Sequence, residues 1–237
     1  MKFSGVARAV AVAVTTVLLC CAAAPEAQGQ RRGGGGAQNG AGEGRASRHV
    51  EEGLRHSEEG NWAEAIKSLR QAVAEDPRDA EAHLLLGDAY MDAGKTDEAF
   101  DSYRQALRLA PNNADAHYSL GVAYNDMGMH GDAFKPFVQA IRLRPDFAEA
   151  HYGIGYAYQR LDNFKAALPY LNAALRLRPD YPEARLSLGL TYVGLGRAAD
   201  AREQLRILEG SDPLLAQELS RAVQNNPSSR AWGYQWP

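Results

Sequence analysis

Four histidines recur at intervals of 34 residues, and histidine is a frequent metal ligand that also transfers protons near neutral pH. They are His49, His83, His117 and His151. The ligands of one metal ion must converge to within about 2 Å of it. Residues spaced so evenly belong to different copies of a repeated unit, and a row of such units does not bring them to one point. We therefore expect no metal site and no cofactor, and we expect these rings to pack between helices.

Other catalytic patterns are missing from the sequence. It has no glycine-rich phosphate loop, no His-Glu-x-x-His and no serine or cysteine in a nucleophile setting. Its two cysteines, Cys20 and Cys21, lie near the N-terminus, so the rest of the chain has no disulfide or thiol chemistry. A formal net charge of −3 gives no reason to expect nucleic acid as a partner. The sequence predicts a protein that is not an enzyme.

Residues 1–28 have the composition of a targeting segment. Lys2 and Arg8 precede an apolar run, Ala9–Leu19, which is followed by small residues. This order is typical of a secretory signal peptide, and the run is short for a transmembrane helix. The alternatives are an uncleaved anchor and lipidation of a cysteine, although no small residue precedes Cys20. We expect an exported protein, periplasmic or secreted, that meets a membrane only through this segment if it is uncleaved or lipidated.

Two further segments look unlike a packed domain. Residues 29–45 are rich in glycine and cannot bury enough apolar surface to offset the entropy of ordering, so we expect a flexible tether. Residues 226–237 form an aromatic tail, which we expect to be loose and either to dock a partner or to fold back on the domain. Its aromatic residues are Trp232, Tyr234 and Trp236.

Between these segments, three columns of residues repeat every 34 residues. The prolines are Pro77, Pro111, Pro145, Pro179 and Pro213, the glycines are Gly53, Gly87, Gly121, Gly155 and Gly189, and the alanines are Ala65, Ala99, Ala133, Ala167 and Ala201. Glycine and alanine remove bulk where two antiparallel helices approach closely. The period predicts five helical hairpins.

Smaller signals mark the ends of the helices. A second set of glycines is expected to end first helices in the left-handed conformation, and polar residues are expected to cap second helices. The glycines are Gly60, Gly94, Gly128 and Gly196, and the caps are Asn61, Thr96 and Asn163. Pro136 and Pro169 fall early in second helices, where we expect a mild kink on the outer face.

The middle copy resembles the tetratricopeptide repeat. It reads Ala114-Asp-Ala-His-Tyr-Ser-Leu-Gly-Val-Ala-Tyr124, followed by Gly128, Ala133, Phe137, Ala140 and Pro145. The resemblance implies an all-α, right-handed α-solenoid of five tandem helix-turn-helix repeats and a C-terminal capping helix. The repeats are expected at 46–79, 80–113, 114–147, 148–181 and 182–215, and the capping helix at 211–225.

In this family, one strip of each first helix lines a concave groove that binds peptides, and helical geometry places that strip away from the packed stripe. The strip holds Leu84, Asp88, Met91, Asp92, Tyr118, Val122, Asn125, Asp126, Tyr152, Tyr156, Gln159, Arg160, Leu186 and Leu190. Tyrosine and apolar residues gathered on an exposed strip are typical of a binding surface. The alternative is that some of these rings merely line the superhelix.

The partner expected from this strip is a protein or peptide. Asp88, Asp92 and Asp126 favour a basic or amide-rich segment. We expect an adaptor in an envelope or secretion assembly. The alternative is a self-associating solenoid, a homo-oligomer whose groove is filled by its own tail or by another copy.

Overall fold

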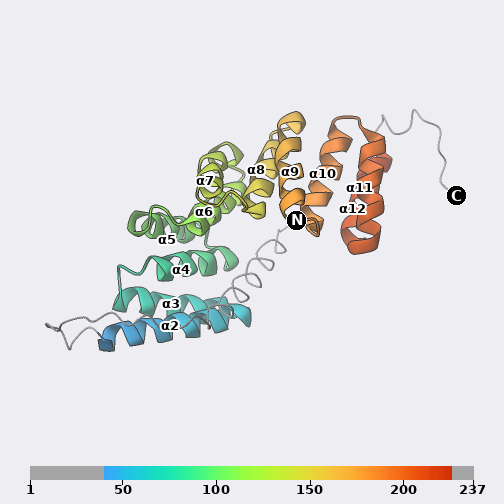
Figure 1. Cartoon of the computed structure of the whole chain (residues 1–237). Helices are drawn as coiled ribbons and strands as arrows, with labels where there is room; N and C mark the ends of the chain where they lie inside the picture. Colours follow the sequence, from blue (N-terminus) through green and yellow to red (C-terminus); the bar gives the residue numbers. More distant parts are fainter. Residues whose placement is uncertain (1–39, 226–237) are drawn as a thin grey trace, which may run out of the picture. The chain divides into compact units, whose positions relative to one another are not determined.

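In the computed structural model, residues 40–225 are described, and their side chains from residue 48 onward. The chain divides into two compact units, residues 1–111 and 112–237. In unit 1, two hairpins are formed by α2 (Gly40–Glu58), α3 (Trp62–Glu75), α4 (Ala80–Asp92) and α5 (Thr96–Leu109) (Figure 1). The first helix begins at Gly40, within the segment that was expected to be a tether.

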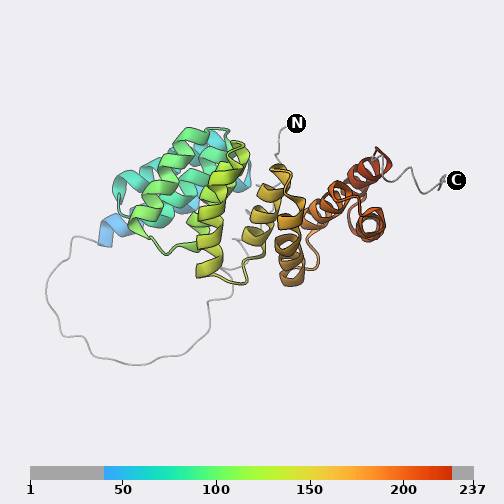
Figure 2. The same ribbon diagram turned by 90° about the horizontal axis from the view of Figure 1, so that it is seen from above.

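Unit 2 contains three hairpins and a final helix (Figure 1). The helices are α6 (Ala114–Asp126), α7 (His130–Leu143), α8 (Ala148–Arg160), α9 (Phe164–Leu177), α10 (Pro182–Gly194), α11 (Ala198–Ser211) and α12 (Pro213–Asn225). The last of these packs on both α10 and α11 (Figure 2). Between residues 40 and 225 there is no strand, so the all-α fold of five hairpins and a capping helix is confirmed.

The glycine and alanine columns hold each hairpin closed. All five alanines of the column are fully buried. A Cβ atom on Gly121 would lie 2.7 Å from the Phe137 ring, and one on Gly87 would lie 2.5 Å from the Tyr103 ring. A larger residue would therefore push the two helices apart. In the last hairpin, a Cβ atom on Gly189 would lie 2.4 Å from the Leu219 side chain of α12. The capping helix therefore completes the core of this hairpin.

The expected turn glycines have positive φ angles between 70° and 75°. In the fourth copy Asp162 takes this place with φ 54°. Of the expected caps, the Asn163 side chain accepts a hydrogen bond from the backbone N–H of Ala166. The other two expectations are wrong, because Asn61 makes no side-chain cap and Thr96 is already inside its helix.

Both prolines lie inside continuous helices, α7 and α9. Pro169 is exposed, but Pro136 is buried, so the expectation of an outer-face position is wrong for Pro136. The expected signal segment and aromatic tail lie outside the described residues. Over the residues that are described, no helix combines the length and the apolar character needed to cross a bilayer.

Candidate peptide-binding face

The residues expected to line a groove lie on α4 of unit 1 and on α6, α8 and α10 of unit 2. Four of them are buried, namely Leu84, Tyr118, Asn125 and Leu186, with exposed fractions of 8%, 6%, 8% and 9%. The expectation that these four side chains face solvent is wrong. The others keep some access to solvent: Asp88, Met91 and Asp92 in unit 1, and Val122, Asp126, Tyr152, Tyr156, Gln159, Arg160 and Leu190 in unit 2.

Tyr118 belongs to the aromatic core of unit 2. Its ring centroid lies 4.9 Å from that of Phe147 and 5.9 Å from that of Phe137. Phe147 stands between α7 and α8, so it reaches Tyr118 from the start of the next hairpin. Truncating Tyr118 would open a cavity in this core. We therefore assign it to folding and not to direct contact with a partner.

Asn125 ties two successive hairpins together. Its Nδ2 donates to the backbone carbonyl of Gly153 at 3.2 Å, and its Oδ1 lies 3.1 Å from Nδ1 of His130. Gly153 also allows the close approach of Phe137, because a Cβ there would lie 2.5 Å from that ring. Burial, with Arg160 nearby, lowers the pKa of His130. Both effects favour the neutral form of the imidazole.

Gln159 stands in the equivalent place one copy later and makes the equivalent contact. Its Nε2 donates to the backbone carbonyl of Ser187 at 3.4 Å. An amide in this place therefore joins the end of one first helix to the middle of the next. Sequence periodicity placed both amides on the open strip, yet their polar groups are used within the protein.

Sequence reasoning missed a pair of arginines at the junctions between hairpins. Arg144 lies 4.3 Å from the Phe147 ring centroid and donates to Asp115 at 2.6 Å. One copy later, Arg178 lies 3.5 Å from the centroid of Tyr181 and donates to Glu149. The signal was present, since an arginine followed three residues later by an aromatic recurs after 34 residues.

Tyr152 connects the junction at Tyr181 with Tyr156, another residue of the expected strip. Its ring centroid is 5.1 Å from that of Tyr181 and 6.1 Å from that of Tyr156. Burial raises the pKa of Tyr152 and of Tyr181 above the usual value, and a hydrogen bond with Ser187 opposes this shift in Tyr152. Both hydroxyls are therefore protonated in the folded protein.

Tyr156 is the expected groove tyrosine that remains best placed to meet a partner. It is half-buried, meets the His130 ring edge-on at 6.2 Å, and has the Arg160 guanidinium 5.9 Å from its centroid. Asp126, at the end of α6, is exposed and has no ion-pair partner among the described residues. Desolvation of its carboxyl raises its pKa to about 6.

We call a group of five accessible side chains on α6 and α8 the α6–α8 surface. It consists of Val122, Asp126, Tyr152, Tyr156 and Arg160. The two helices contact each other directly. An aromatic pair flanked by one cation and one anion can bury apolar area and also fix the orientation of a peptide.

In unit 1 the expected strip is smaller and more acidic. Asp88 accepts a hydrogen bond from the Tyr103 hydroxyl at 2.8 Å, so it helps to orient that core residue. Desolvation raises the pKa of Asp92. Met91 is half-buried. The strip in this unit has no aromatic ring. A nearby cation would stabilise the charged form of Asp92.

Two of the four histidines in the repeated column contact the turn that precedes their helix. Nε2 of His83 lies 3.2 Å from the carbonyl of Pro77, and Nε2 of His151 lies 3.2 Å from that of Pro145, so each ring N–H donates to the loop before its helix. Arg185, in the same column, donates to the carbonyl of Pro179 at 2.7 Å. Each of these three side chains links the proline turn to the helix that follows it through a hydrogen bond.

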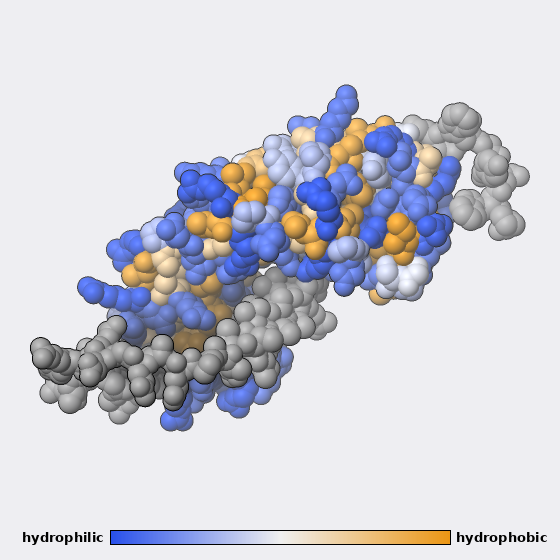
Figure 3. Space-filling view, viewed as in Figure 1, coloured by the Kyte–Doolittle hydropathy of each residue, from blue (hydrophilic) through white to orange (hydrophobic). Residues whose placement is uncertain are grey.

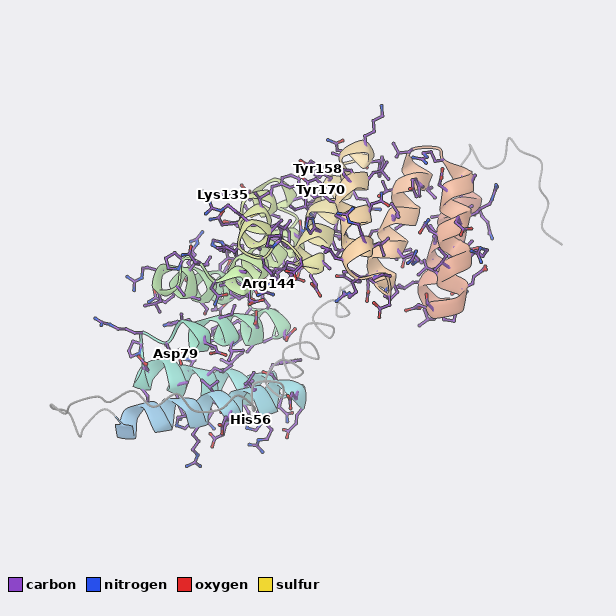
Figure 4. The ribbon with its side chains drawn as sticks, in the orientation of Figure 1. His56, Asp79, Lys135, Arg144, Tyr158 and Tyr170 are labelled. Atoms are coloured by element: carbon purple, nitrogen blue, oxygen red, sulfur yellow. The ribbon has the colours of Figure 1, made fainter. Side chains whose placement is uncertain are left out.

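Figure 3 shows apolar residues interrupting a mainly hydrophilic surface over unit 2. Figure 4 labels Arg144 at the junction between hairpins, and it labels Tyr158 and Tyr170 along a different side of the same unit. Unit 2 therefore carries distinct surfaces.

Comparison with known proteins agrees with this architecture. A TPR repeat model matches residues 87–128 and 130–162. Models described as tetratricopeptide repeat match residues 57–99 and 152–216. Among curated proteins, none matches the sequence.

Several solved structures have the same fold. The crystal structure of MamA is 26% identical, with a TM-score of 0.59, and the match covers 71% of this chain and 94% of MamA. TTC0263, a thermophilic TPR protein from Thermus thermophilus, is 24% identical, with a TM-score of 0.63 and coverage of 76% and 99%. PilF from Pseudomonas aeruginosa is 20% identical, with a TM-score of 0.68 and coverage of 81% and 90%.

The matched ranges run from residue 57 to residue 216 and take in more than half of the sequence. The described helices form the hairpins that such repeats require. The chain therefore belongs to the tetratricopeptide-repeat family.

Proposed function

We propose that this protein is a non-catalytic scaffold that binds a segment of a partner protein on the α6–α8 surface of unit 2. Proteins built from these repeats are protein-interaction scaffolds in general. The observation that carries the specific proposal is the half-buried pair Tyr152 and Tyr156, whose rings lie side by side with the Arg160 guanidinium close to one of them. Tyrosine and arginine are the residue types in which binding energy concentrates.

A basic or amide-rich segment fits this surface best. The carboxyl of Asp126 is partly desolvated and has no ion-pair partner among the described residues, so a lysine or arginine of the partner would stabilise its charged form. Amide side chains of the partner could hydrogen-bond the same carboxylate. Contact with Arg160 would then favour a carbonyl or carboxylate elsewhere in the segment.

The proposal is tested by placing a photo-crosslinking amino acid at Tyr156 and, as a control, at Lys67 on α3. A partner captured only from the first position is identified and purified. Its dissociation constant is then measured for the wild type, for Tyr156→Ala and for Asp126→Lys. We expect at least tenfold weaker binding for each variant and unchanged helicity. Equal capture from both positions, or unchanged affinity in both variants, would contradict the proposal.

We also propose that the protein is exported and acts in an envelope or secretion assembly. The support is the sequence of the first residues, in which Lys2 and Arg8 precede an apolar run. Fractionation of the native cells, followed by mass spectrometry of the mature N-terminus, tests this. Full-length protein found solely in the cytoplasm would contradict export.

A further inference from the structure

A second surface of unit 2 is formed by the outer sides of α7 and α9. Six exposed side chains define what we call the α7–α9 strip. They are Lys135, Val138 and Arg142 on α7, and Lys165, Pro169 and Arg176 on α9. The strip carries four cations on a protein whose formal net charge is −3.

Among the described residues, two cations on other second helices form ion pairs, and these four do not. On α3, Lys67 pairs with Glu64 at 3.2 Å, and on α11, Arg206 pairs with Glu203 at 2.8 Å. None of the cations in the α7–α9 strip has an acidic partner within the described part of the chain. Moreover, α9 contains no acidic residue in its 14 residues.

Lys165 is placed where helix electrostatics disfavour it. It lies in the first turn of α9, close to the positive end of the helix dipole, where acidic side chains are preferred. The second helices of the other four hairpins, α3, α5, α7 and α11, all have an acid in the first turn. By contrast, Arg142 and Arg176 lie in last turns, where the dipole favours them. The charge of Lys165 therefore has no local explanation.

Aromatic contacts through α8 fix the two helices of the strip in place. The ring of Tyr158 lies 4.4 Å from that of Phe134 on α7 and 5.8 Å from that of Tyr170 on α9. All three rings are half-buried. Figure 4 shows Lys135, Tyr158 and Tyr170 along the same side of the unit. The two helices that carry the cations are thus joined through a cluster of half-buried rings.

We propose that the α7–α9 strip binds an acidic segment of a partner protein. Carboxylates of the segment would pair with the lysines and arginines, and an apolar side chain would rest on Val138 and the edges of the rings. Nucleic acid fits less well, because base stacking needs available ring faces, and here Tyr158 already packs against both Phe134 and Tyr170. An anionic membrane also fits less well, since the strip lacks the broad apolar face of an interfacial helix.

The test measures binding of a fluorescein-labelled peptide of glutamates and leucines to the full-length protein by anisotropy. The variant is Lys135→Glu with Lys165→Glu. The matched control, Lys67→Glu with Arg206→Glu, has the same charge change on α3 and α11. We expect affinity for the peptide to fall at least tenfold in the variant and less than threefold in the control, and wild-type binding to weaken as salt is added.

Parallel titrations with phosphatidylglycerol vesicles and with a single-stranded oligonucleotide identify the class of partner. Tighter binding of either than of the peptide would overturn the proposal, as would an equal loss of affinity in variant and control. Self-association that is lost in the variant would also overturn it, in favour of a second copy. If circular dichroism shows that charge reversal unfolds the helices, the pair Lys135→Gln and Lys165→Gln replaces it, with at least a threefold loss expected.

Discussion

The two units close the junction between successive hairpins in different ways. In unit 1, Asp79 precedes α4, and its carboxylate accepts hydrogen bonds from the backbone N–H groups of Glu81 and Ala82. In unit 2, Phe147 and Tyr181 stand in the same place before α8 and α10, and neither provides a side-chain cap. Their rings are buried instead, each beneath an arginine.

One place in the repeat therefore supports two physical solutions. A cap stabilises a helix end locally and typically contributes about 1 kcal/mol. A buried aromatic ring removes far more apolar surface from water and joins elements that are distant in sequence. We infer that unit 2 depends more strongly than unit 1 on its junction residues. Tyr152 of the α6–α8 surface packs against Tyr181, so the junction rings also hold the candidate binding residues in position.

The largest effect is expected for Tyr181→Ala. The ring is 4% exposed and packs against Tyr152, so its removal leaves a cavity in unit 2. Loss of a buried aromatic side chain costs about 3–5 kcal/mol of unfolding free energy. Urea denaturation followed by circular dichroism measures the loss, and hydrogen exchange should locate it in α8–α10. A loss below about 1 kcal/mol would contradict the assigned role of the ring.

A smaller effect is expected for Asp79→Ala. The substitution removes two hydrogen bonds to the first turn of α4 but leaves no cavity. Loss of such a cap costs about 0.5–2 kcal/mol, and faster hydrogen exchange should be confined to unit 1. Asp79→Asn serves as the control, because asparagine caps helices about as well. If the alanine variant is as damaging as Tyr181→Ala, the two junctions do not differ as we infer.

The arginine above Tyr181 should contribute less again. Arg178→Met keeps much of the apolar stem but removes the cation over the ring and the pair with Glu149. A partly desolvated cation–π contact contributes about 0.5–2 kcal/mol. Arg144→Met should be milder, because Arg144 and Asp115 are 42% and 54% exposed, against 33% and 24% for Arg178 and Glu149. Thermal unfolding of the two variants tests this order, which the reverse ranking would refute.

The hairpins could be predicted from the sequence because their closest contacts need particular small residues. A Cβ atom on Gly121 would lie 2.7 Å from the Phe137 ring, and Ala133 is fully buried, so neither place accepts a larger side chain and both columns repeat strictly. Helix caps were less predictable. The Asn163 side chain caps α9, whereas Asn61, in the same place of another copy, donates to Glu59 instead. Several hydrogen-bond partners compete at such sites, and the local sequence does not decide between them.

The candidate surface was harder to predict, for a geometric reason. Helical periodicity gives the direction in which a side chain leaves its own helix, but it does not show whether the next hairpin covers that direction. Tyr118 is covered by Phe147, and Asn125 is covered by the backbone of Gly153. Both contacts depend on how one repeat stacks on the next. Tyr156 and Arg160, on the first helix of the next copy, keep access to solvent.

The smallest expected effect is a difference in pH dependence within unit 2. Burial lowers the pKa of His130, so as the pH falls through the usual value of 6.5 this group is protonated to a greater extent in the unfolded chain than in the folded chain. This group therefore favours unfolding as the pH falls through 6.5. Desolvation raises the pKa of Asp126 from 3.8 to about 6, so the folded chain binds the extra proton between these values. Stability from Asp126 therefore grows as the pH falls, and the two contributions oppose each other.

Two variants separate them. In Asp126→Asn only the histidine contribution remains, and the unfolding free energy should decrease between pH 7 and pH 5 relative to wild type. The contribution of a single proton to the slope of the unfolding free energy against pH cannot exceed about 1.4 kcal/mol per pH unit. In His130→Gln, which can still donate to Oδ1 of Asn125, the change relative to wild type should have the opposite sign. Urea denaturation at matched ionic strength measures both. If both variants shift in the same direction, burial does not lower the pKa of His130 as we infer.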